Sequence, residues 1–306
     1  EKLGDYEIIE DVDASVIHDR KWKDTPFRRY TLNKSVRPKV GGKPHFVKQA
    51  IDHTHSIWKN MGFTQMTGNH VQSAFWDLDA LFVPQDHPAR DMQDTFYLDV
   101  ESDVPKIVNE VKKIHEEGLP DGRGWQTAFN EAESRKTLLR THTTALSAKY
   151  IQMAAENPEK THKYYSVGRV FRNEALDWKH LMEFHQVEGI VIGKDLTFRR
   201  LIAYVKDFFT AMGYDDVRLR PGYFPYTEPS LEVDVYVESQ EEWMELGGAG
   251  IIRTEVTKPL GLPESHNVLA WGLGLDRVIT SYYEIDDLRD MYRNNLREDR
   301  KRKRYM

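Results

Sequence analysis

The sequence of 306 residues contains no cysteine. This absence excludes disulfides, thiolate nucleophiles and zinc sites with cysteine ligands, and it fits a reducing compartment. No apolar run is long enough to cross a membrane, and the acidic start "EKLGDYEIIEDVDAS" is unlike a signal peptide. We therefore expect a cytoplasmic protein without a membrane partner. Because the chain begins with Glu1 rather than Met, we also expect a longer natural N-terminus.

The net charge is small for a chain of this size. The 43 Lys and Arg residues nearly balance the 49 Asp and Glu residues, which leaves a formal charge of -6. Without an overall positive field the chain is not expected to bind DNA, and an RNA contact requires a local patch or a partner. With 40% hydrophobic and 30% charged residues, the composition is that of a folded protein with a real core.

Sequence motifs of several common active sites are also missing. The glycine clusters "ELGGAG" and "GLGLDR" have neither the spacing of a dinucleotide-binding turn nor that of a P-loop. There is no H-E-x-x-H zinc pattern and no G-x-S-x-G nucleophile elbow, so Ser147 has no local support as a nucleophile. His142, His180 and His185 are better suited to hydrogen bonding a substrate than to binding zinc.

The chain divides into three parts by composition. Residues 1–44 are polar and end in "RPKVGGKPH", whose prolines and glycines are typical of a linker. Residues 45–296 form the main domain, in which helical spacing predicts helices over "HFVKQAIDHTHSIWKNMGF" and "LTFRRLIAYVKDFFTAMGY", ending at Gly62 and Gly213. Residues 297–306, "REDRKRKRYM", are a basic tail of the kind that is usually solvated and frayed.

Four other segments alternate apolar and polar residues and are rich in Val, Ile, Tyr and Phe. They are "KYYSVGRVFRNE", "FHQVEGIVIG", "SLEVDVYVE" and "EWMELGGAGII". This pattern predicts strands of a mostly antiparallel sheet. Because strands follow one another while helices stand apart, the sequence favours an α+β fold over a doubly wound sheet.

Polar side chains recur at every second position of two of these strands: Arg172 with Glu174, and Gln186 with Glu188. Each pair therefore points to one face. For a single strand this would indicate an exposed face with salt bridges, but the glycines near Arg277 suggest a floor that a ligand approaches closely. Separated arginines, acids and glycines are what an ATP site without a P-loop requires, since guanidinium groups hold phosphate oxygens and carboxylates hold Mg²⁺.

These residues lie in segments that resemble known signatures. "GRVFRNE" (168–174) and "GLGLDR" (272–277) resemble the second and third signatures of class II aminoacyl-tRNA synthetases. With "RTHTTA" (140–145), "FHQVEG" (184–189) and "YFPYTEPS" (223–230), they resemble the catalytic alpha subunits of phenylalanyl-tRNA synthetases. "PQDHPARDMQDTFYL" (84–98) is similar to the archaeal and eukaryotic branch of that family. The resemblance covers residues 20–296 and implies the class II synthetase fold, an antiparallel sheet flanked by helices.

The resemblance implies an enzyme that ligates L-phenylalanine to tRNA(Phe) through phenylalanyl-adenylate. It implies ATP as a substrate, Mg²⁺ as a cofactor and a beta subunit as a partner, in an assembly of two alpha and two beta subunits. Because the attacking carboxylate is already an anion at neutral pH, catalysis is expected to rest on positioning and charge neutralisation.

Individual roles at the nucleotide end follow from the same resemblance. Arg172 is expected to hold the α-phosphate, and Arg277 to contact the γ-phosphate of a bent ATP and cover one face of adenine. Phe184 is expected to stack on the other face. Glu174 is expected near the adenine end, and His180 near the phosphates.

For the amino acid, the resemblance implies a second set of residues. They are His142, Thr144, Gln186, Glu188, Phe224, Tyr226, Ile252, Ala270 and Gly272. Glu228 is expected to bind magnesium together with the beta subunit. The sequence departs from the family at Ile252, where phenylalanine is usual, and at Thr254, where proline is common.

Two alternatives remain open. A related synthetase for another amino acid, such as O-phosphoserine, would need a cationic pocket, and Phe224 with Tyr226 argues against one. A non-catalytic paralogue that senses an amino acid or tRNA would commonly lack a signature arginine, whereas Arg172 and Arg277 are both present.

Overall fold

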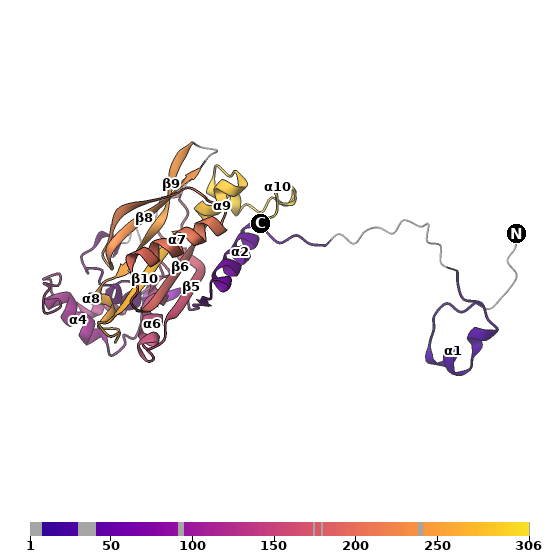
Figure 1. Ribbon diagram of the computed structural model, residues 1–306, viewed down its shortest axis with the longest axis horizontal. Helices are drawn as coiled ribbons and strands as arrows, with labels where there is room; N and C mark the ends of the chain where they lie inside the picture. Colours follow the sequence, from indigo (N-terminus) through magenta and orange to yellow (C-terminus); the bar gives the residue numbers. More distant parts are fainter. Residues whose placement is uncertain are drawn as a thin grey trace. The chain divides into compact units, whose positions relative to one another are not determined.

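The computed structural model describes residues 8–29, 41–90, 95–173, 175–178, 180–237 and 241–305 (Figure 1). Its chain divides into two compact units, residues 1–43 and residues 44–306. The smaller unit contains helix α1 (Ala14–His18) and the 3-10 helix η1 (Lys21–Lys23). Among the described residues, no helix is both long enough and apolar enough to span a bilayer.

A seven-stranded sheet organises the larger unit, in the order β1-β5-β6-β10-β9-β8-β7. Only the short pair β1 with β5 is parallel, and all other neighbours are antiparallel. The α+β prediction is therefore confirmed, as are the four predicted strands, except that the first ends at Phe171 and does not include Arg172. The strands are β1 (Thr64–Gln65), β5 (His162–Phe171), β6 (Glu183–Lys194), β7 (Val217–Phe224), β8 (Thr227–Val237), β9 (Glu242–Ile252) and β10 (His266–Gly274).

Three helices cover one face of this sheet: α2 (Phe46–Asn60), α7 (Phe198–Ala211) and α9 (Leu275–Tyr283). Figure 1 shows α2 and α7 lying across the strands on the same side. In the core beneath them, Trp58 stacks on Phe208 at 4.7 Å and on Trp271 at 5.2 Å between ring centroids. Both predicted helices are confirmed, and the glycines predicted to end them, Gly62 and Gly213, have the positive φ that such positions need.

A second core lies on the opposite side of the sheet, under α6 (Thr144–Ala155) and a smaller sheet of order β2-β4-β3. The remaining elements complete this layer and the chain's end. They are β2 (Val71–Ser73), α3 (Ala74–Asp77), η2 (Asp79–Leu81), η3 (Pro88–Arg90), β3 (Tyr97–Glu101), α4 (Val108–Glu117), α5 (Glu131–Arg135), β4 (Lys136–Leu139), α8 (Thr254–Thr257), η4 (Leu288–Met291) and α10 (Leu296–Lys301).

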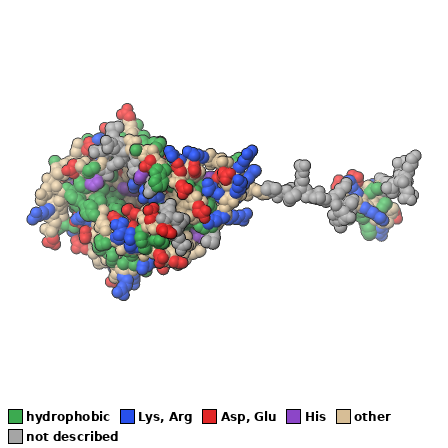
Figure 2. All heavy atoms as spheres, turned by 90° about the horizontal axis from the view of Figure 1, so that it is seen from above, with side chains coloured by type: hydrophobic (Ala, Val, Ile, Leu, Met, Phe, Trp, Pro, Cys, Tyr) green, Lys and Arg blue, Asp and Glu red, His purple; other side chains and the backbone are tan. Residues whose placement is uncertain are grey.

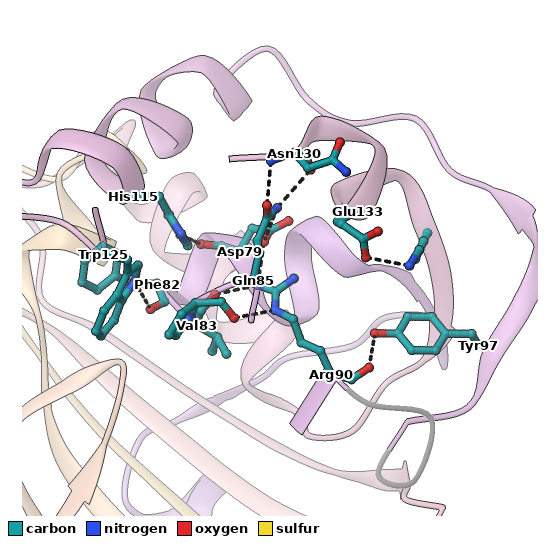
Figure 3. Close-up of polar contacts among 12 residues, drawn as sticks. Asp79, Phe82, Val83, Gln85, Arg90, Tyr97, His115, Trp125, Asn130 and Glu133 are labelled. Carbon is teal, nitrogen blue, oxygen red and sulfur yellow. Dashed lines mark hydrogen bonds and ion pairs between the residues drawn. The ribbon is translucent and has the colours of Figure 1, made fainter. Parts of the chain in front are cut away.

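The segment that begins "PQDHPAR" is held by a buried ion pair (Figure 3). Arg90 lies 2.6 Å from the Asp79 carboxylate, and neither side chain is more than 7% exposed. The same guanidinium donates to the carbonyls of Pro84 at 2.8 Å and Val83 at 2.6 Å. Removing one partner of such a pair leaves a buried charge uncompensated, which destabilises the fold. The ion pair therefore has a structural role in holding this segment.

Burial of His115 makes stability depend on pH. Its Nε2 lies 2.8 Å from the Asp79 carbonyl, and burial lowers the pKa of the imidazole below its usual 6.5 (Figure 3). The folded chain thus takes up a proton less readily than the unfolded chain. The stability that neutral His115 contributes is fully present above about pH 6.5 and is lost as the pH falls below that value.

We predict that the midpoint temperature of thermal unfolding decreases when the pH is lowered from 7.5 to 5.5. In the His115→Gln variant this decrease should be smaller. Glutamine keeps a donor near the position of Nε2 but cannot titrate. His55 and His70, whose pKa values are also lowered by burial, preserve part of the slope. An unchanged slope in His115→Gln would contradict this assignment.

The basic tail is mostly exposed, as predicted, but the prediction that it is frayed is wrong. The Arg302 guanidinium lies 4.8 Å from the centroid of the Phe46 ring on α2, and the Tyr305 ring lies 4.5 Å from that of Tyr282 on α9. Tyr282 also donates its hydroxyl to the Arg304 carbonyl at 2.8 Å. The charge run indicated solvation, but aromatic and cation–π contacts dock the segment on the helical layer.

Candidate active site

One cavity of about 420 Å³ lies on the face of the sheet opposite α2, α7 and α9. Figure 2 shows acidic and basic side chains intermixed on the visible surface of the larger unit, as the small net charge suggests. The cavity is lined by side chains from many elements, among them His142, Thr144, Arg172, His180, Phe184, Gln186, Glu188, Phe224, Tyr226, Glu245, Ala270, Gly272 and Arg277. The structure thus brings together most of the residues that the sequence predicted.

Register across three strands builds the cavity floor. Gly272 on β10 pairs with Glu188 on β6 and with Gly248 on β9. A Cβ at Gly272 would lie 2.8 Å from Gln186 Nε2, and one at Gly248 would lie 2.2 Å from the Phe224 ring. Gly248 therefore needs glycine, because a Cβ there would overlap the rigid Phe224 ring, whereas a Cβ at Gly272 would displace only the end of the flexible Gln186 side chain.

Glu188 is the most highly coordinated side chain of the site. Its Oε2 accepts hydrogen bonds from Thr143 at 2.7 Å, Thr144 at 2.9 Å and Gln186 at 3.1 Å, and its Oε1 accepts one from Ser147 at 2.5 Å. Burial raises the pKa of this carboxyl, and the hydroxyl donors oppose the rise. The carboxylate joins β6 to the first turns of α6.

Sequence reasoning missed Thr143 and Ser147. Three hydroxyls at positions 143, 144 and 147 share one helix face, because residues three and four apart are neighbours. This spacing of hydroxyl residues could have indicated a shared polar partner. The structure gives Ser147 a positioning role toward Glu188, which agrees with the absence of a nucleophile motif around it.

The cavity has a cationic end. Arg172 follows β5, and its guanidinium carbon lies 5.2 Å from the centroid of the Phe184 ring. Arg277, in the first turn of α9, lines the same cavity, and its guanidinium makes no hydrogen bond or ion pair with any described residue. His180 is oriented by Asp177, whose carboxylate oxygens both lie 3.0 Å from its Nδ1. Two guanidinium groups facing one space suit a ligand with several negative charges.

The other end is aromatic. The Phe224 and Tyr226 rings stack with 6.1 Å between their centroids, and the centroid of the Tyr226 ring lies 6.4 Å from that of the His142 ring. Burial and the nearby Glu188 raise the pKa of Tyr226, so its hydroxyl is neutral. His142 Nδ1 is buried and has no partner among the described residues, which leaves it able to bond a ligand. Ala270 is 6% exposed and bounds this end.

Two predicted site residues are absent from the cavity lining, and a third is not among the described residues. Ile252 is buried in the core with Ala270 and does not line the cavity. Glu228 is exposed at the start of β8, also outside the lining. Glu174 falls outside the described residues.

Among the described residues, acidic side chains do not gather into a metal-binding group. Across the described ranges, no group of three His, Asp or Glu side chains could hold a metal ion. Mg²⁺ is usually held by one or two carboxylates with substrate phosphates and water. Glu228 could supply one ligand only, so its predicted role depends on groups from outside this chain.

Comparison with known proteins supports the resemblance. Residues 29–301 match the family model of tRNA synthetases class II core domain (F). The phenylalanine–tRNA ligase alpha subunit of Thermoplasma acidophilum is 44% identical over 298 residues, covering 96% of this chain and 58% of that protein. The corresponding protein of Archaeoglobus fulgidus is 46% identical, covering 95% of this chain and 60% of that protein.

The chain spans less than two thirds of the length of these curated relatives. Among solved structures, the pyrrolysyl-tRNA synthetase of Desulfitobacterium hafniense matches with a TM-score of 0.57 and 16% identity, covering 81% of this chain and 73% of that one. At this identity the similarity shows the fold alone.

Proposed function

The chain belongs to the class II tRNA synthetase core family, and from this premise we propose that it ligates L-phenylalanine to tRNA(Phe) with ATP. The carboxylate attacks the α-phosphorus of ATP, giving phenylalanyl-adenylate and pyrophosphate, and the acyl group then moves to the terminal ribose of tRNA. The proposal includes Mg²⁺ as cofactor, a beta subunit as partner in an assembly with two copies of each chain, and the cytoplasm as location.

The observation that carries this proposal is the polarity of one cavity, with two arginines at one end and two stacked aromatic rings at the other. A triphosphate fits the cationic end and a phenyl ring fits the aromatic end. Strand register sets Gln186 and Glu188 between them. Gln186 pairs with Gly274, three residues before Arg277. Glu188 pairs with Gly272, beside the Gly248 that Phe224 covers. This order matches the reaction, in which a carboxylate must meet the α-phosphorus.

Each side chain then has a defined task. Arg172 neutralises the charge that grows on the α-phosphate, while Arg277 binds the γ-phosphate and the adenine ring, assisted by His180 and Phe184. These contacts hold the reactants in line without a general base, because the nucleophile is already ionised.

Amino-acid binding uses the groups oriented by Glu188. Gln186 donates its Nε2 to that carboxylate, which turns its carbonyl oxygen toward other partners. We assign this oxygen, the charge of Glu188 and the hydroxyl of Thr144 to the substrate ammonium, and His142 to the substrate carboxylate. Bound magnesium would supply positive charge to the phosphates, and Glu228 is proposed as its ligand only where the beta subunit completes the site.

Phenylalanine-dependent exchange of pyrophosphate into ATP tests this function, with tyrosine and O-phosphoserine as controls. The chain is measured alone and with a beta subunit. Exchange with phenylalanine, and little with either control, is expected. Exchange with phosphoserine would support the related synthetase instead. If neither preparation catalyses exchange although the chain binds ATP, the result would support a non-catalytic paralogue.

The small side chain of Ala270 is expected to set the size of the phenyl pocket. Ala270→Gly should admit para-substituted phenylalanines, while Ala270→Val should exclude even phenylalanine. Removing one methyl contact costs about 0.8 kcal/mol, so the KM for phenylalanine should rise only about fourfold in the glycine variant. Exchange with 4-chlorophenylalanine measures the gain, and unchanged selectivity in both variants would place the ring elsewhere.

A further inference from the structure

Three polar side chains form a hydrogen-bonded network where α9 begins, in which the buried His185 and Asp276 meet Tyr292, a residue that is 37% exposed. Tyr292 donates its hydroxyl proton to Asp276 Oδ2 at 2.5 Å. His185 Nδ1 lies 3.1 Å from Asp276 Oδ1 and 3.1 Å from the Tyr292 hydroxyl oxygen. Because an ionised carboxylate can only accept, the network assigns the proton of His185 to Nδ1. The His185 and Asp276 residues are only 7% and 2% exposed.

This network adjoins the cationic end of the cavity, and Asp276 is itself one of the lining residues. On β6, Phe184 and Gln186 line the cavity, whereas His185 between them points to the opposite face. Asp276 directly precedes Arg277 in the first turn of α9. Two of the side chains assigned to ATP are therefore one residue away from a member of the network.

A third connection reaches the loop between β5 and β6. The 3-10 helix η4 ends at Met291, directly before Tyr292. From this helix the Leu288 backbone N–H donates to the Trp178 carbonyl at 3.0 Å. Because that loop also carries His180, an anchor at Tyr292 restrains a third side chain of the cationic end.

We propose that His185, Asp276 and Tyr292 are positioning residues that hold Phe184 and Arg277 in the arrangement that binds ATP. The inference rests on the proposed function, since it takes ATP as the ligand of the cationic end. None of the three contacts the aromatic end, where Phe224, Tyr226 and Ala270 lie. The network should therefore affect the two substrates unequally.

The hydroxyl of Tyr292 is a reliable donor in this arrangement. Burial and the adjacent Asp276 carboxylate raise its pKa, so it stays protonated throughout the neutral range. Tyr292→Phe removes that donor while preserving the ring, which makes it the least disruptive test.

Steady-state pyrophosphate exchange by the chain, with its beta subunit if that is required, measures the effect. Tyr292→Phe is expected to raise the KM for ATP about tenfold, as for a lost hydrogen bond to a charged group. The KM for phenylalanine and kcat at saturating ATP should change less than about twofold. His185→Leu should behave alike, whereas His185→Asn, whose amide can replace Nδ1–H, should restore most of the affinity.

Tyr214→Phe is the matched control, because Tyr214 also donates a hydroxyl to α9, at the Val278 carbonyl, but lies outside the network. Its KM for ATP should match that of the wild type. An unchanged KM for ATP in Tyr292→Phe would overturn the inference, as would an equal rise in both KM values. Wild-type protein that shows no exchange would instead overturn the proposed function, so the two failures are distinguishable.

Discussion

Arg172→Ala is expected to lower the rate of phenylalanyl-adenylate formation by about 10²–10³-fold. The guanidinium lines the cavity beside Phe184, where it can neutralise charge that develops on the α-phosphate. Because Arg172 is only partly buried, the midpoint of thermal unfolding should stay close to that of the wild type. Pyrophosphate exchange and thermal unfolding, measured on the same preparation, check both parts.

Arg169→Ala provides the matched control. Arg169 lies three residues earlier on β5, is exposed, and pairs with Glu183 at 2.8 Å without lining the cavity. An exposed pair of this kind contributes little to stability. Its exchange rate should remain near that of the wild type. A fully active Arg172→Ala variant would contradict the assigned role.

Glu188→Ala is expected to damage both folding and activity. The substitution removes the acceptor for three hydroxyls and one amide, and it disconnects β6 from α6. Because rotating hydroxyls recover only part of this loss, we expect the free energy of unfolding to fall by about 3 kcal/mol. Phenylalanine activation should be lost as well. Chemical denaturation and pyrophosphate exchange measure the two effects.

Glu188→Gln separates these effects. Its amide oxygen can accept the bonds made to Oε2, and Ser147 can rotate to accept from the amide nitrogen. Stability should therefore change by about 1 kcal/mol or less. The KM for phenylalanine should still rise at least about tenfold, because the substrate ammonium loses a nearby anion. Unchanged phenylalanine affinity would make Glu188 purely structural.

The sheet was predictable from the sequence because its strands carry a strict two-residue alternation. Gln186 and Glu188 share a face with the cavity, while Val187 lies in the core under the helices. The same alternation explains why polar and charged residues occur in strands that are rich in apolar residues, because the polar face of these strands lines the cavity. Gly62 and Gly213 were equally predictable, since both end a periodic apolar pattern.

Other features depend on contacts between distant parts of the chain. Nothing near Gly248 in the sequence indicates that Phe224 lies over it, because register between β7, β8 and β9 sets that contact. The basic tail was misjudged for a related reason. Its charges are visible in the sequence, but the docking of Tyr305 on α9 is a long-range contact. Ile252 was assigned to the pocket by resemblance, whereas packing places it in the core.

The most direct test of the proposed site is a crystal structure of the chain with a non-hydrolysable analogue of phenylalanyl-adenylate. We predict that its phenyl ring contacts Phe224, Tyr226 and Ala270. Its phosphate should lie within hydrogen-bond distance of Arg172, and its adenine should lie against Phe184 and Arg277. An analogue bound with its phenyl ring at the arginine end, or outside this cavity, would contradict the account.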